Sequence, residues 1–366
     1  MRTTTSSGVT LEYPDAQSMA FNPFLLKASG ASVDRLNITL SDGGSPAITK
    51  SVTFDGFGAA VYCDLQEWVQ SYFNALSFAV DYTQVTEKTT QGMTLSFSVS
   101  AEAGGSVITT FSFTSFVVWG ALAIGEHYNE NREVTWFQGF PFSVGMYFAT
   151  PMNVYLGVNG SPTIVSVINS QGIFNVIVDD AMGGTWLTLG ELTNYVDNGT
   201  FDATFDLTFR GVSGDIVEKV KIKLVSPFYD EGYYLRWVDR HGFTCYWLFK
   251  SVSKQLKAES NYEYQRNNLL AYDQNYGFIA GAGRRIAYNR SEVIPVCAPL
   301  VTQSDWDYIS DLATSPVVDL FMGLDENNVP QWTAVTIEAG TYTKTDDDLQ
   351  DYLCNIVKPE TPTQEL

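Results

Sequence analysis

YYLRWVDRHGFTCYWLFK, residues 233–250, is the stretch that decides the fold. Two runs rich in aromatic and β-branched residues flank a short polar connection, a pattern that predicts a strand, a tight turn and a second strand. Gly242 supplies the positive φ that such a turn needs. Large rings on both strands predict that the hairpin lies in a core or an interface, with an aromatic platform for a ligand as the alternative. These rings are Trp237, Tyr246, Trp247 and Phe249.

The composition of the whole chain agrees with a fold made of strands. At 366 residues the chain is long enough for two or three domains. Aromatic residues make up 14% and charged residues only 17%, which favours β structure over a helical enzyme. We therefore expect a mainly β protein of two or three antiparallel β-sandwich or barrel-like domains with one or two short helices.

The proline-containing breaks Phe140-Pro141 and Thr150-Pro151 predict a loose domain boundary near residues 130–150. A polar, tyrosine-rich stretch at 254–276 and the glycine-rich residues 277–283 after it predict a long loop or arm at about 254–283. The expected parts are an N-terminal β domain at 1–140 with a helix at about 64–76, a second β domain at 141–230, a C-terminal β-rich domain at 231–357 and a solvated tail at 358–366.

Apolar residues at helical spacing predict the helix at 64–76, with Asp64 as its N-cap and Glu67 completing a capping box. A second, shorter helix is expected at 305–313, with Ser304 as its cap.

Two alternating segments, 201–209 and 219–224, predict a charged hairpin. Aspartate and threonine alternate with apolar residues in the first segment, and lysine does so in the second. Antiparallel pairing would place opposite charges across from each other, which favours one register. A solvated hairpin face is the simpler interpretation of both segments.

A formal net charge of −20 disfavours direct nucleic-acid binding, which needs clustered Lys and Arg. The first residues lack an apolar signal segment, and the most apolar run, 116–125, is too short to span a bilayer. We expect no membrane insertion. The cysteines are far apart, which predicts buried free thiols from a reducing compartment. They are Cys63, Cys245, Cys297 and Cys354.

Catalytic signatures are scarce. His127 and His241 are the histidines, and neither belongs to a recognisable nucleophile or zinc motif. A pair of Cys245 with His241 is less favoured than a satisfied turn histidine beside a packed cysteine. Residues 346–348, three aspartates, predict an exposed turn because the calcium-loop spacing is missing. A catalytic pair of carboxylates, as in a glycosidase, stays open as an alternative, because such a pair is defined by its distance in space and not by its spacing in the sequence. We expect no enzyme, metal or cofactor.

The hairpin sequence also resembles structural proteins of tailed phages and prophages of Bacteroides-type bacteria. EYQR, AYDQNYG, GAGRR and VIPV continue the resemblance through 262–296, and PLVTQSDWDYISDLATSPVVDLFMG, VTIEAGTYTK and LQDYLCNIV through 298–357. It covers roughly the last third of the chain. The resemblance implies a virion protein made in the bacterial host cytoplasm, in a tail, baseplate or tail hub, acting as an adaptor in a symmetric ring. Its partners would be other copies and neighbouring tail proteins.

A carbohydrate- or receptor-binding β-sandwich module at the virion tip, with a host surface glycan as its ligand, is the alternative. For the ring adaptor we expect subunit contacts from the arm, because tyrosine suits interfaces and arginine suits the acidic surfaces of identical copies. The competing interpretation is a loop folded back on its own domain. The candidate contact residues are Tyr262, Tyr264, Arg266, Tyr272, Tyr276, Arg284 and Arg285.

Overall fold

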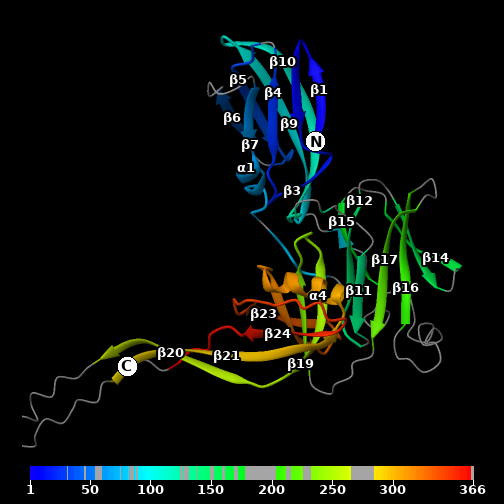
Figure 1. The fold of residues 1–366 in the computed structure, drawn as a ribbon, viewed down its shortest axis with the longest axis vertical. Helices are drawn as coiled ribbons and strands as arrows, with labels where there is room; N and C mark the ends of the chain where they lie inside the picture. The colour runs from blue at the N-terminus through cyan, green and yellow to red at the C-terminus, as the bar shows by residue number, and fades with distance from the viewer. Residues whose placement is uncertain are drawn as a thin grey trace, which may run out of the picture. The chain divides into compact units, whose positions relative to one another are not determined.

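The computed structural model shows a protein built mainly of strands, with short helices α1 and α4 (Figure 1). The expected mainly β fold is confirmed. The chain divides into unit 1, Met1–Ser226 with Val238–Cys245, and unit 2, Pro227–Trp237 with Tyr246–Leu366. The structure describes residues 1–363 except 31, 45–46, 54–59, 75, 81, 83–85, 88–89, 124–125, 127–131, 138, 149–151, 159–160, 169–171, 178–202, 212–215, 226–231 and 265–283.

Unit 1 begins with a four-stranded sheet, in the order β1-β2-β4-β7, and a five-stranded sheet, in the order β3-β10-β9-β5-β6. Their strands are β1 (Arg2–Ser6), β2 (Val9–Tyr13), β3 (Gln17–Met19), β4 (Leu25–Ser29), β5 (Arg35–Ser41), β6 (Ile48–Thr53), β7 (Ala60–Asp64), β9 (Gly92–Ala103) and β10 (Ser106–Val118).

One core joins these two sheets, because the inner strands of both alternate apolar residues with polar ones. In β5 the buried residues are Leu36, Ile38 and Leu40, and the residues between them are partly exposed. Phe97 of β9 stacks on Phe24 at 4.9 Å between ring centroids. Core residues come from both sheets, as expected for a sandwich.

The helix predicted at 64–76 is much shorter, and its predicted cap is wrong. α1 spans Gln66–Gln70, and its N-cap is Leu65, which makes no side-chain cap. Asp64 is the last residue of β7, where it pairs with Leu25 of β4. Its carboxylate accepts from the backbone N–H of Gln66 at 2.9 Å, so it still satisfies a free donor at the helix start.

Two further sheets in unit 1 have the orders β11-β17-β16-β13-β14 and β12-β15-β8. Their strands are β8 (Thr86–Glu87), β11 (Arg132–Phe137), β12 (Ser143–Phe148), β13 (Met152–Val158), β14 (Ser161–Ile168), β15 (Gly172–Ile177), β16 (Ala203–Gly211) and β17 (Ile216–Val225).

The charged hairpin forms as expected: β16 and β17 are antiparallel, and Asp206 lies opposite Lys221. The structure adds a partner that the sequence did not suggest. Strand β11 runs parallel to β17 on its other side. Glu133 of β11 pairs with Lys221 at 3.1 Å and with Lys223 at 3.7 Å.

Unit 2 holds a six-stranded antiparallel barrel. The strands follow the order β19-β18-β22-β23-β24-β21, and the pairing of β19 with β21 closes the ring. They are β18 (Gly232–Val238), β19 (Thr244–Ser251), β21 (Arg284–Val301), β22 (Val318–Leu324), β23 (Pro330–Ile337) and β24 (Gln350–Val357). β20 (Gln255–Tyr264) pairs with β21 outside the ring.

The predicted hairpin of residues 233–250 is confirmed as β18 and β19, with Gly242 at a φ of 84° in the turn. Its large rings are core. Trp237 is 1% exposed and Trp247 is 7% exposed. Both pack on Tyr308, at centroid distances of 5.6 and 6.3 Å. The alternative of an aromatic ligand platform on this hairpin is therefore wrong.

The second helix begins earlier than predicted. α4 spans Gln303–Ser310, and a 3-10 turn, η1, continues over Asp311–Ala313. Its cap is Thr302, which forms a full capping box with Asp305. The predicted Ser304 lies inside the first turn. The sequence SDWD resembles a capping box, but the extended backbone that a cap requires occurs at Thr302, where β21 has just ended.

Candidate subunit-contact site

The stretch predicted as an arm is a two-stranded ribbon. β20 pairs with the first half of β21 from Gln255 opposite Val293 to Tyr264 opposite Arg284. The ribbon extends past the other strands of the barrel (Figure 1). The prediction of a loop is therefore wrong for residues 255–264, which form a strand. Residues 265–283 lie outside the described part of the chain.

Strand β20 is exposed on both faces at the base of this ribbon. Consecutive residues of a strand point to opposite sides, yet Gln255, Leu256, Lys257 and Ala258 are all exposed. Leu256 is 60% exposed, and Val252, just before the strand, is 57% exposed. A two-stranded hairpin without a packed face is marginally stable in water. The ribbon therefore presents a surface that a partner could stabilise.

The C-terminal tail covers one edge of the ribbon. The Lys358 N–H donates to the carbonyl of Glu292 at 3.0 Å, and the Thr361 N–H donates to the carbonyl of Arg290 at 2.8 Å. The Lys358 ammonium also pairs with the Glu292 carboxylate at 3.0 Å. The tail lies beside β21, so the edge of the ribbon without a neighbouring strand in the described chain is that of β20.

The structure brings four of the predicted contact residues together. Tyr264 lies opposite Arg284, and Tyr262 pairs with Ala287, two positions from Arg285. All four positions lie on the two strands of the ribbon. Arg266, Tyr272 and Tyr276 fall outside the described residues. The sequence did not single out Leu256 and Lys257, because the alternation of Leu256 and Ala258 with polar residues in QLKAES is too short to be a clear strand signal.

A second polar site surrounds His241 in unit 1. Its Nε2 lies 2.9 Å from the Glu126 carboxylate, and its Nδ1 lies 3.4 Å from Asp239. Burial alone would lower the pKa of His241, but the hydrogen bond and charge of Asp239, and then the charge of Glu126, raise it. Asp239 is also buried, which by itself raises its pKa, yet bonding to His241 and nearby positive charge lower it. The site stabilises an imidazolium.

This arrangement agrees with the predicted satisfied turn histidine. The Cys245 thiol donates to Asp239 at 3.6 Å, which is a packed cysteine beside a carboxylate. The predicted free thiols are also confirmed, since all the cysteines are free and buried. His127 falls outside the described residues.

Other candidates for binding sites are modest within the part of the chain that the structure describes. It contains no cluster of three His, Cys, Asp or Glu side chains that could hold a metal ion. Asp346, Asp347 and Asp348 are exposed, as predicted for a turn. Among the tyrosines and tryptophans whose side-chain burial the structure describes, Tyr62 is the exposed one, at 63%. Among the described helices, none is long and apolar enough to cross a membrane.

Comparison with known proteins adds little. No protein-family model matches the sequence, and no curated protein matches it. Among solved structures, the chain is similar to one titled "Crystal Structure of the Periplasmic Chaperone SfaE". That match has a TM-score of 0.21 and 12% identity, over 60% of this chain and 100% of the other. At this TM-score the likeness carries no argument about fold or function.

Proposed function

We propose that this chain is a virion structural protein of a phage tail, baseplate or tail hub, and that it acts as an assembly adaptor in a symmetric ring. The sequence resemblance supplies the setting. The observation that carries the mechanism is the β20–β21 ribbon, whose strand β20 is exposed on both faces at its base. A ribbon of this kind gains its stability from the neighbour that covers it.

The chemistry of the ribbon suits a second copy of the same chain. Leu256 offers apolar area, and the free edge of β20 offers backbone hydrogen bonds to an added strand. Lys257 and the arginines at 284, 285 and 290 lie on the two strands. With a formal net charge of −20, copies of this chain offer acidic surfaces to such cations. A head-to-tail contact that closes would generate a ring.

Shortening the ribbon tests this function. Ala258 and Arg290 lie directly opposite each other, so an Asn-Gly turn can replace residues 259–289 without moving the barrel strands. The same variant carries Leu256→Ser and Lys257→Ser, which remove the contacts of the exposed base that remains. The variant should fold with wild-type circular dichroism but stay a monomer by light scattering. It should also fail to enter assembled particles when it is co-expressed with neighbouring tail proteins.

A matched control uses the same operation elsewhere on the barrel. Leu324 and Pro330 face each other at the β22–β23 turn, and Asn-Gly can replace residues 325–329 between them. This control should assemble like the wild type. Normal assembly of the shortened-ribbon variant, with unchanged stoichiometry, would show that the ribbon does not make the subunit contact.

A further inference from the structure

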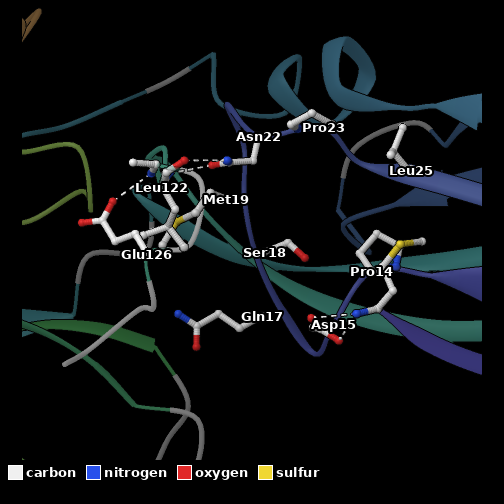
Figure 2. A pocket seen from close by; sticks show the side chains of 12 residues that line it. Pro14, Asp15, Gln17, Ser18, Met19, Asn22, Pro23, Leu25, Leu122 and Glu126 are labelled. Atoms are coloured by element: carbon white, nitrogen blue, oxygen red, sulfur yellow. Dashed lines mark hydrogen bonds and ion pairs between the residues drawn. The ribbon is translucent and has the colours of Figure 1, made fainter.

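A groove of about 430 Å³ lies along strand β3 in unit 1 (Figure 2). All of β3 lines it, from Gln17 to Met19. The other walls come from Met1, Pro14, Asp15, Asn22, Pro23, Leu25, Leu122, Ala123 and Glu126. Segments that are distant in the sequence therefore meet around a very short strand.

Strand β3 is an edge strand of its sheet. Its partner is β10, which runs parallel to it. The Phe116 N–H donates to the carbonyl of Ala16 at 2.7 Å, and the Ala20 N–H donates to the carbonyl of Val118 at 2.8 Å. In a parallel ladder alternate residues bond to the same neighbour, so the backbone groups of Gln17 and Met19 point away from the sheet. The Met19 carbonyl accepts from the Asn22 N–H at 3.3 Å.

The Gln17 side chain adds a donor that lacks an acceptor. Its Nε2 is buried and has no hydrogen-bond partner within the described structure. Figure 2 shows the amide extending from β3 with no dashed line to the other residues drawn. A buried donor without a partner is unfavourable and rare in folded proteins. An acceptor on a bound molecule would satisfy it.

The lining selects among ligand classes. The Glu126 carboxylate already contacts His241 and Arg240, and accepts from the Ala123 N–H. Asp15 pairs with the terminal ammonium of Met1 at 3.1 Å. No aromatic ring and no Lys or Arg is among the described residues of the lining, which disfavours a sugar and a phosphate. Apolar walls complete the groove, at Pro14, Pro23, Leu25 and Leu122.

We propose that this groove binds an uncharged extended peptide segment of a partner protein, which adds to β3 as a new edge strand. Backbone groups of the peptide pair with those of Gln17 and with the N–H of Met19, and small apolar side chains contact Leu25 and Leu122. A carbonyl of the peptide accepts from the Gln17 amide. Three residues of β3 allow roughly 10 Å of pairing at about 3.3 Å per residue.

The test uses the full chain and an array of eight-residue peptides built from Ala, Gly, Ser, Thr, Val and Asn. The best binder is measured by fluorescence anisotropy, and its alternate residues are then N-methylated to remove the pairing donors. N-methylation should abolish binding. Gln17→Leu should weaken binding about tenfold, the effect of one lost hydrogen bond in a partly dry site.

Gln91→Leu is the matched control. The Gln91 Nε2 is likewise buried without a partner in the described structure, but the residue does not line the groove. Both variants should keep the wild-type melting temperature, and the control should keep wild-type peptide binding.

An array without any binder overturns the proposal, as does a best binder that tolerates both N-methylation and Gln17→Leu. Binding to a glycan array instead would also overturn it. The shortened-ribbon variant should bind the peptide normally, so this test is separate from that of assembly.

Discussion

The Nε2 of His241 lies 2.9 Å from the Oε1 of Glu126, which places the imidazole between that carboxylate and Asp239. The pKa of His241 is raised above its ordinary value of 6.5. A raised pKa stabilises the fold fully below the unfolded pKa, and this stability is lost as pH rises through the folded pKa. Asp239 has a lowered pKa, so its contribution is present above its ordinary 3.8 and is lost as pH falls through the folded value.

His241→Gln should therefore reduce stability most between about pH 4 and pH 6.5. We expect a loss of about 1–3 kcal/mol there, because charged partners are left without a hydrogen bond. The loss should shrink toward pH 9. Urea unfolding at a series of pH values measures it.

Arg240→Gln is the control for the histidine variant. Arg240 is 45% exposed and pairs with the same Glu126 carboxylate at 3.1 Å. Loss of this exposed pair should cost under about 1 kcal/mol without a matching pH profile. If the loss of unfolding free energy in His241→Gln grew as pH rose from 5 to 9, the inference that the site stabilises an imidazolium would be wrong.

Trp237→Ala should destabilise the protein by about 3–5 kcal/mol, because a large ring that is 1% exposed leaves a cavity beside Tyr308. Thermal unfolding followed by circular dichroism measures the change. Tyr62→Ala, at a 63% exposed position, should change stability by under about 0.5 kcal/mol. Equal melting temperatures for the wild type and Trp237→Ala would contradict the core role.

Reducing agent should leave the melting temperature unchanged, because all the cysteines are free. Burial, and next the charge of Cys297, raise the pKa of the Cys354 thiol to about 12. Little thiolate exists at neutral pH, so this residue should resist iodoacetamide in the folded protein and react in urea. Mass spectrometry of the labelled peptides reads both states. Fast labelling of Cys354 in the native protein would disprove its burial.

Thr302→Ala should cost about 1 kcal/mol, since the Thr302 hydroxyl accepts from the backbone N–H of Asp305 at 3.2 Å and caps α4. Ser304→Ala should cost under about 0.5 kcal/mol, because Ser304 is an exposed first-turn residue. Chemical denaturation of both variants compares them. A larger loss of stability in Ser304→Ala than in Thr302→Ala would indicate that Ser304 caps the helix, as expected from the sequence.

The sequence predicted the hairpin well because its signal is local. Aromatic strands on either side of Gly242 carry their own periodicity and turn chemistry. The start of α1 was not predictable in the same way. Asp64 resembles an N-cap in its own neighbourhood, but pairing with Leu25, far away in the chain, holds it in a strand.

The groove along β3 was not predicted from the sequence, and the β20–β21 ribbon was predicted as a loop, for a related reason. Strand β3 spans only Gln17–Met19 and pairs with β10, about a hundred residues later, so no local pattern announces it. The ribbon strand β20 has no buried face at its base, so its composition resembles that of a loop. Apolar periodicity reports burial in the chain's own core, and it is weak where a strand lacks one.

Strand β21 has a consequence for how this protein can vary. It is one strand of 18 residues, in which one half pairs with β24 and the other half pairs with β20. Insertion of a single residue between the halves would turn every ribbon side chain to the opposite side. Insertion of two residues in each ribbon strand would lengthen the reach and preserve its facing. Related chains should therefore differ in ribbon length by even numbers of residues per strand.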